Sequence, residues 1–275
     1  MEQGAVAVGP ALAAVLVVLV LVAVATVRAG RLGHARGIAT AALRAVVQLC
    51  AVALLITAVL RSWWASAAFV TLMILVAAAT SARRVSSLRL GWPVLAPIAA
   101  GALPASALVV ASGTVPLTEV AVVPIAGILI GGAMTATSLA GRRALDELRD
   151  RHGEYEAALA LGFVPRDAAL EICRPSAGQA LVPALDQTRT VGLVTLPGAF
   201  VGVLLGGGTP VQAGAAQLLV LVALLAVEAI AVAVTVELVA NGLLRRPGPA
   251  VQVALRRPTA RSGRNPKAGW SSDAS

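Results

Sequence analysis

Five polar or charged side chains interrupt long apolar stretches of the sequence, where their chemistry needs an explanation. Arg44 and Gln48 lie four residues apart and share one face if the stretch is helical. Asp186 and Arg189 lie three residues apart in a later stretch, and Glu228 stands near the middle of a third. Charged groups in apolar helices face protein or water and commonly line the path of an ion or a proton. These residues are therefore candidates for a polar pathway.

Each candidate also has a purely structural explanation. Arg44 can extend its side chain to the lipid headgroups, and Gln48 can bond a neighbouring helix. An ion pair between Arg44 and Asp186 would satisfy both charges, because a lone buried charge costs several kcal/mol. Glu228 lies about 16 Å from the nearer end of its stretch, so it is protonated and hydrogen-bonded, paired, or open to a water-filled cavity. Glu237 follows nine residues later, close to the end of the same stretch.

Catalytic chemistry finds little support in this chain, and an enzyme is not expected. The pattern G-x-x-x-x-G-K-[ST] is absent and the sole lysine is Lys267, so the chain is expected neither to hydrolyse ATP nor to hold a cofactor. His34 and His152 lie outside the apolar stretches, and no metal ligands are assigned. Cys50 lies in an apolar run and Cys173 in a polar segment, which argues against a disulfide framework.

The composition indicates which elements position the candidate residues. Hydrophobic residues make up 58% of the 275 residues and charged residues 13%, with a mean hydropathy of +0.87. These values are typical of a multi-pass membrane protein. Apolar runs of about twenty residues are long enough to cross the hydrocarbon core as helices. The sequence predicts an all-α fold with seven transmembrane helices, at residues 6–27, 38–60, 64–80, 92–111, 120–140, 181–205 and 213–239.

The distribution of arginine sets the expected topology. Arginines follow the first, third and fifth stretches and crowd the C-terminal segment, whereas the other loops carry almost none. The positive-inside rule then predicts an N-out, C-in protein of the cell (inner or plasma) membrane. The net charge of +9 belongs to these loops and does not indicate nucleic acid. We expect one transmembrane domain over residues 1–244, with a cytoplasmic loop at 142–180, and a disordered basic cytoplasmic tail over 245–275.

The segment Glu154–Pro175 is the most polar long stretch before the tail. Its residues 154–161 are strong helix formers, and Gly162 suits the left-handed conformation that closes a helix. Pro165 suits the first position of a second helix, with Asp167 in its first turn. The sequence predicts two short helices joined by a sharp bend, an elbow that either lies against its own membrane domain or docks on a partner. The apolar residues that it offers are Ala157, Ala158, Leu161 and Phe163.

The spacing within this elbow resembles the E-A-A loop of ABC-transporter permeases, the cytoplasmic loop that docks on the ATPase subunit. That pattern is E-A-A, three residues, Gly, nine residues, Ile, one residue and Leu-Pro, and Arg174 stands where Leu is expected. The resemblance implies a separate cytoplasmic ABC ATPase as the partner, which binds the ATP. The matching residues, expected to couple to the ATPase, are Glu156, Ala157, Ala158, Gly162, Ile172 and Pro175.

Residues 38–240 as a whole resemble the iron-export (FetB-like) permeases of bacteria, whose plant relatives act in aluminium tolerance. The resemblance implies a permease subunit for metal-linked export that works as a homodimer with two ATPase subunits. It adds Met134, Pro197 and Gly198 to the pathway candidates. The matching runs are Arg44 with Gln48-Leu49, G-I-L-I-G-G-A-M at Gly127–Met134, E-A-A-L-A-L-G-F at Glu156–Phe163, and P-A-L-D-Q-T-R-T-V-G-L-V-T-L-P-G at Pro183–Gly198.

Two departures from that family leave the cargo open. The family's Pro-Gly-Met-Met is Pro-Gly-Ala-Phe at residues 197–200, and its Gly-Asn-Ala-Met-Asn is Gly-Gly-Ala-Met-Thr at residues 131–135. These changes remove thioether and amide groups that could contact a metal. The alternative function is a stand-alone secondary transporter driven by protons through Glu228 and Asp186, and the E-A-A spacing speaks against it.

Overall fold

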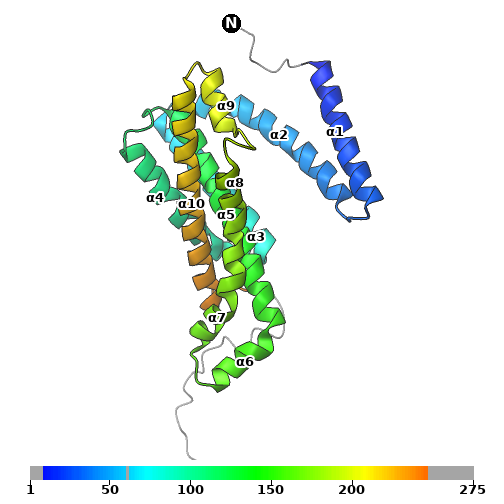
Figure 1. Cartoon of the computed structure of the whole chain (residues 1–275), viewed down its shortest axis with the longest axis vertical. Coiled ribbons are helices and arrows are strands. Elements are labelled where there is room, and N and C mark those ends of the chain that lie inside the picture. The colour runs from blue at the N-terminus through cyan, green and yellow to red at the C-terminus, as the bar shows by residue number, and fades with distance from the viewer. Residues whose placement is uncertain (1–8, 60–61, 247–275) are drawn as a thin grey trace, which may run out of the picture.

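The structure, a computed structural model, describes residues 9–59 and 62–246 (Figure 1). Within these ranges the fold is all-α, as predicted, and one isolated bridge joins Val191 to Thr195. Most of the expected tail, from residue 247 on, lies outside the described residues. The helices are α1 (Pro10–Ala29), α2 (Ala35–Val59), α3 (Trp63–Val85), η1 (Trp92–Val94), α4 (Leu95–Ala111), α5 (Glu119–Asp150), α6 (His152–Ala160), α7 (Pro165–Gly178), η2 (Gln179–Leu181), α8 (Val182–Thr190), α9 (Gly198–Leu205) and α10 (Pro210–Ala240).

Six helices in the described part of the chain are long and apolar enough to cross a membrane. They are α1, α2, α3, α4 with its η1 turn, α5 and α10, and they match six of the seven predicted spans within a few residues. The helix of the fifth span continues well beyond its apolar part, to Asp150. The protein is therefore a multi-pass membrane protein built on at least six apolar helices.

The prediction of one continuous helix over residues 181–205 is wrong. The stretch forms two short helices, α8 and α9, separated by residues 191–197. Gly192 has a φ of +81° inside the break, a conformation that costs glycine little. Pro197 occupies the N-cap position of α9 in an extended conformation and cannot donate the hydrogen bond that would continue α8. The two halves differ in composition, because α9 is apolar whereas α8 carries Asp186, Gln187 and Arg189.

The helices divide into a packed bundle and an outlying hairpin. In the bundle, α5 and α10 pack against each other and against α4 and α7, and α3 packs against α5. The hairpin of α1 and α2 stands apart from the bundle in Figure 1, and its main packing partner there is α3. None of the residues in α1 is buried. We call α1 and α2, residues 10–59, the arm.

A close approach of two helix backbones in the bundle is made possible by a glycine in α4. A Cβ atom on Gly101 would lie 2.7 Å from the backbone oxygen of Val227 in α10. Real side chains essentially never tolerate such a distance to a backbone atom, so only glycine fits. Gly131 in α5 has the opposite environment, because an added Cβ would meet nothing within 4 Å. The two glycines form a matched pair for a test of packing.

Gly101→Ala is expected to destabilise the bundle by about 1–3 kcal/mol, the usual cost of overpacking a tight interface. Gly131→Ala is expected to be neutral or mildly stabilising, because alanine favours helix and has room there. Thermal unfolding of both purified variants in the same detergent measures the difference. Equal melting temperatures for the two variants would contradict the close approach of α4 and α10.

Candidate functional site

The predicted elbow is present, and the expected glycine closes its bend. Gly162 follows α6 with a φ of +94°. Its backbone N–H donates to the carbonyl oxygen of Leu159 at 3.0 Å, and the N–H of Phe163 donates to that of Ala158 at 3.1 Å. These two bonds form a Schellman motif, which ends a helix and redirects the chain. The direction of the elbow is thus set by local hydrogen bonds.

The second helix of the elbow, α7, is anchored by its buried face. It begins at Pro165 with Asp167 in its first turn, as predicted. Ile172 and Cys173 are buried, and the thiol of Cys173 donates to the carbonyl oxygen of Ala144 in α5 at 3.5 Å. Burial raises the pKa of Cys173 to about 12, since the thiolate loses its hydration. Ile172 therefore anchors the elbow to the bundle and is not available to a partner.

The turn between α6 and α7 exposes apolar side chains, which we call the elbow tip: Leu161, Phe163 and Val164. Their exposed fractions are 82%, 48% and 57%. Contiguous exposed apolar residues in a polar segment are typical of an interaction surface. In the rest of the E-A-A pattern, Glu156, Ala157 and Pro175 are exposed and Ala158 is partly buried.

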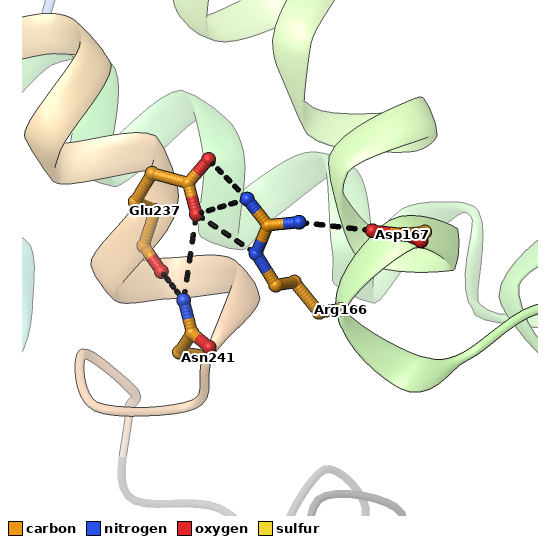
Figure 2. A network of polar contacts seen from close by, with 4 residues as sticks. All are labelled: Arg166, Asp167, Glu237 and Asn241. Carbon is orange, nitrogen blue, oxygen red and sulfur yellow. Dashed lines mark hydrogen bonds and ion pairs between the residues drawn. The ribbon is translucent and has the colours of Figure 1, made fainter.

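An ion-pair network connects the elbow to the end of α10 (Figure 2). The guanidinium of Arg166 donates to both carboxylate oxygens of Glu237, at 2.8 Å from Nη2 to each and at 3.0 Å from Nε to Oε2. Arg166 also donates to Asp167 at 3.0 Å, and Asn241 donates to the backbone oxygen of Glu237 at 2.7 Å. A bidentate arginine–carboxylate contact fixes both distance and orientation. This network braces α7 against α10.

Glu237, expected only near the end of its apolar stretch, is the residue of α10 to which the elbow is anchored. The side chain that pairs with it, Arg166, is separated from it by 71 positions in the sequence. A second brace at the same end of the bundle was also missed: Arg246 pairs with Asp146 of α5 and donates to the backbone oxygen of Val85 at 3.0 Å. The only sequence signal for either brace is an unmatched charge near a helix end.

Among the pathway candidates, Glu228 is the one placed inside the bundle. It is partly buried in α10, and a Cβ atom on Gly132 of α5 would lie 3.1 Å from its Oε1. Met134, two residues further along α5, packs against the hydrophobic core. The carboxylate of Glu228 thus lies at the contact between the two central helices.

The other candidates are spread over the surface of this single chain. Asp186 and Arg189 are exposed on α8 and lie 3.6 Å apart as an ion pair. Arg44 and Gln48 are exposed on the arm. Because α8 belongs to the bundle and α2 leads away from it (Figure 1), the predicted pair between Arg44 and Asp186 is not formed within the chain.

Two hollows lie beside the broken helix. One is a groove of about 590 Å³ between the end of α7 and α10, lined by Gly178, Leu181, Ala229 and Ala233, among others. The other is a cavity of about 240 Å³ between the break and α10. Pathway candidate Pro197 lines this cavity, and Gly198 begins α9 beside it. Phe200 and Gln217 also line it, and Phe200 stands where the FetB-like pattern has a methionine.

In the described ranges of the chain, no group of three or more His, Cys, Asp and Glu side chains is arranged to hold a metal ion. Each of the two histidines instead contacts a residue close to it in the sequence. The Nδ1 of His34 donates to the backbone oxygen of Leu32, and the Nε2 of His152 lies 3.3 Å from Oε1 of Glu156. Both contacts are local, within four residues of the histidine.

Removing the brace is expected to loosen the elbow without unfolding the bundle. In a Cys50→Ala background, Cys173 is the sole thiol and is shielded in the elbow. Arg166→Ala should raise the rate of maleimide labelling of Cys173 about two- to fivefold, the scale of one exposed ion pair acting on local opening. Labelling followed by mass spectrometry measures the rate.

Arg149→Ala is the matched control for this experiment. Arg149 is also an arginine of the elbow end, but it is 73% exposed in its side chain and contacts only the adjacent Asp150, at 3.7 Å. Its removal should leave the labelling rate of Cys173 unchanged. Identical rates for the Arg166 and Arg149 variants would show that the brace does not hold α7.

The comparisons with known proteins agree with this architecture. Residues 11–244 match the model of an uncharacterised protein family, UPF0014. The chain is 34% identical over 208 residues to the rice UPF0014 membrane protein STAR2, covering 74% of this chain and 72% of the relative. It is 29% identical to the Bacillus subtilis UPF0014 membrane protein YjkA over 74% of this chain and 82% of the relative.

A shorter match connects the chain to a named permease. It is 36% identical over 118 residues to the probable iron export permease protein FetB of Escherichia coli, covering 42% of this chain and 44% of that protein. No solved structure shows a significant match. The family model covers most of the chain, including the elbow, the broken helix and all six apolar helices from α1 to α10, and the chain therefore belongs to the UPF0014 family of membrane proteins.

Proposed function

We propose that this chain is the membrane-spanning permease subunit of an ABC exporter whose ATP is bound and hydrolysed by a separate ATPase subunit. The observation that carries the proposal is the elbow tip, an exposed apolar surface made by Leu161, Phe163 and Val164. It sits on two short helices that are braced against the bundle. Exposed apolar side chains on helices that are held in place by the bundle are suited to fill a groove on a partner subunit.

The proposed cargo is a metal ion or a metal-linked solute. The support is the relative named a probable iron export permease. A carboxylate at the centre of the bundle, that of Glu228, is suited to attract a cation as it passes. One of the two departures from the FetB-like pattern includes Phe200, which lines the cavity, so iron itself is not assigned.

In the proposed mechanism, the ATPase moves the elbow and the elbow moves α10. The tip docks on the ATPase, so closure of the ATPase displaces α6 and α7. The bidentate contact of Arg166 with Glu237 carries that displacement to α10, and α10 holds Glu228 against α5. A full transporter contains two copies of this chain and two ATPase subunits, with the elbow on the cytoplasmic side.

The alternative, a stand-alone transporter driven by protons, has one observation in its favour: the partly buried carboxylate of Glu228 beside Gly132. The two functions differ in their energy source. The chain is reconstituted in sealed vesicles with and without its ATPase subunit, and metal flux is followed under ATP or under a pH gradient.

Flux that requires both the ATPase and ATP supports the exporter. Flux driven by the pH gradient in vesicles containing this chain alone would replace the exporter by the proton-driven transporter. A catalytically inactive ATPase variant is the matched control, because it preserves docking and removes only hydrolysis.

A further inference from the structure

The arm has the composition of a membrane-crossing hairpin but lacks the packing of one. Both of its helices are long and apolar enough to span a bilayer, yet none of the residues in their most apolar windows is buried. α3, α4, α5 and α10 each have about a third or more of that window buried. The arm is therefore the one apolar helical pair in the described residues whose surroundings this chain does not supply.

The exposed face of the arm includes groups that lipid does not accommodate. Arg44 is the tenth residue of α2, about 14 Å along the helix from its start, and Gln48 follows one turn later. Both side chains are exposed. A guanidinium and an amide at this position need hydrogen-bond acceptors, which hydrocarbon lacks. The arm therefore calls for a polar protein surface opposite Arg44.

The bundle carries a surface that offers an exposed acid, which we call the α8–α10 face. It contains the groove lined by Gly178, Leu181, Ala229 and Ala233, which also includes Arg174 and Glu237 at its polar end. Asp186 follows Leu181 by five residues; its side chain is 61% exposed and is paired with Arg189 at 3.6 Å. An apolar groove with an acid at its end is complementary to an apolar helix that carries an arginine.

The acids of the α8–α10 face lie close to one level of the bundle. Leu181 lines the groove together with Ala233 of α10. The five residues from Leu181 to Asp186 rise about 7.5 Å, as do the five from Ala233 back to Glu228. Because α8 and α10 run in opposite directions (Figure 1), this brings Asp186 toward the level of Glu228.

We propose that the arm of one copy packs on the α8–α10 face of a second copy, so that Arg44 of each protomer faces Asp186 of the other. This inference rests on the two-copy permease of the proposed function and names its interface. Repeating the contact by two-fold symmetry satisfies both arms and both acidic faces and closes the assembly at two copies. The ion pair between Arg44 and Asp186 that the sequence suggests is then formed between copies, with Gln48 one helical turn from Arg44.

Complementation between two differently tagged copies tests the proposal. Arg44→Asp alone and Asp186→Arg alone each place like charges at both interfaces of a homodimer, and each should weaken dimerisation at least tenfold. In a mixed dimer of the two variants, the new carboxylate at position 44 faces the new guanidinium at position 186, and the second interface keeps its native pair. Pull-down of one tag through the other should therefore recover to the level of the unmodified chain.

Two results of the mixing experiment would overturn the proposal. If each arm packs on its own bundle, every chain keeps its own mismatch and mixing restores nothing. If Arg44 faces lipid headgroups, Asp186→Arg leaves dimerisation unchanged. ATPase binding is measured on the same samples, because intact ATPase binding with unaltered dimers refutes only the arm interface, whereas loss of ATPase binding by the unmodified chain refutes the proposed function.

Cysteine cross-linking gives a second readout that does not depend on charge reversal. In a Cys50→Ala, Cys173→Ala background, Arg44→Cys on one tagged copy and Asp186→Cys on the other should form a covalent dimer carrying both tags. With both cysteines on one copy and none on its partner, no internal cross-link should form. Pairing Arg44→Cys with Glu156→Cys, at the distant elbow, is the negative control. A cross-link confined to one chain, or equal yields for positions 186 and 156, overturns the interface.

Discussion

Leu161→Asp is expected to lower the affinity of the chain for its ATPase subunit about thirtyfold or more and to leave the bundle folded. Leu161 is 82% exposed at the elbow tip, so it contributes little to its own fold. An apolar anchor that fills a partner's groove typically contributes about 2 kcal/mol or more, which corresponds to about thirtyfold in Kd. A carboxylate placed in that groove adds a desolvation cost. Titration of the purified ATPase onto the chain in nanodiscs measures the Kd.

Val211→Asp is the matched control for this substitution. Val211 is 81% exposed, nearly the same as Leu161, and lies at the start of α10, the opposite end of the bundle from the elbow. Both variants introduce the same charge at an equally exposed apolar position. If their Kd values for the ATPase agree, the elbow tip is not the docking surface. Unchanged melting temperatures for both variants exclude unfolding as the cause of any loss.

The elbow could be predicted in detail because its geometry is determined locally. Gly162 and Pro165 act through the conformations of their own backbones, and the hydrogen bonds that close the bend span only a few residues. The apolar spans were predictable for a related reason, since length and hydropathy are properties of a single segment. Structure that is determined by neighbouring residues can therefore be predicted from a single sequence.

The contacts between distant segments were not predictable in this way. Glu237 could be placed near the end of its helix, but its partner Arg166 lies 71 positions away, and nothing in the spacing pairs the two. The break over residues 191–197 was missed because the polar groups of α8, among them Asp186 and Arg189, were interpreted as pathway candidates inside one longer span. In the structure Pro197 is the N-cap of a new helix, α9.

The charged pathway candidates fall into two groups in the structure. Glu228 is held within the bundle by the contact of α10 with α5, whereas Arg44, Asp186 and Arg189 are exposed to whatever surrounds the chain. A sequence shows that such charged groups are unusual in an apolar stretch. It does not show whether the same chain supplies the partners that satisfy their charge and hydrogen bonds. The three exposed residues need a second molecule to satisfy them. The carboxylate of Glu228 needs a functional or a structural explanation within the bundle.

The brace and the buried carboxylate lie on the same helix, nine residues apart. In the proposed mechanism, movement of the elbow pulls on Glu237, and α10 is continuous from Glu237 to Glu228. That continuity connects the elbow with the centre of the bundle by a single helix. The carboxylate of Glu228 is therefore the group whose chemistry should respond to ATP hydrolysis, and removing its charge tests this directly.

Glu228→Gln is expected to reduce ATP-driven metal transport about tenfold or more, while folding and ATPase binding remain normal. Glutamine has nearly the same size as glutamate, so the contact beside Gly132 is preserved. The amide lacks the negative charge that stabilises a cation in the path, and a loss of about 1.4 kcal/mol at the barrier is a tenfold loss of rate. Flux of a metal ion into inside-out vesicles, measured with a fluorescent indicator, gives the rate.

Glu119→Gln provides the comparison, because it makes the same chemical change outside the centre of the bundle. Glu119 lies in the first turn of α5, at the far end from the elbow. Its transport should match that of the unmodified chain. If Glu228→Gln also transports at the normal rate and with the same pH dependence, the charge of Glu228 has no part in the mechanism. The carboxylate would then serve only to pack α10 against α5. The path would have to run through the cavity beside Phe200 and Gln217. The amide oxygen of Gln217 is buried without a hydrogen-bond partner in the described structure.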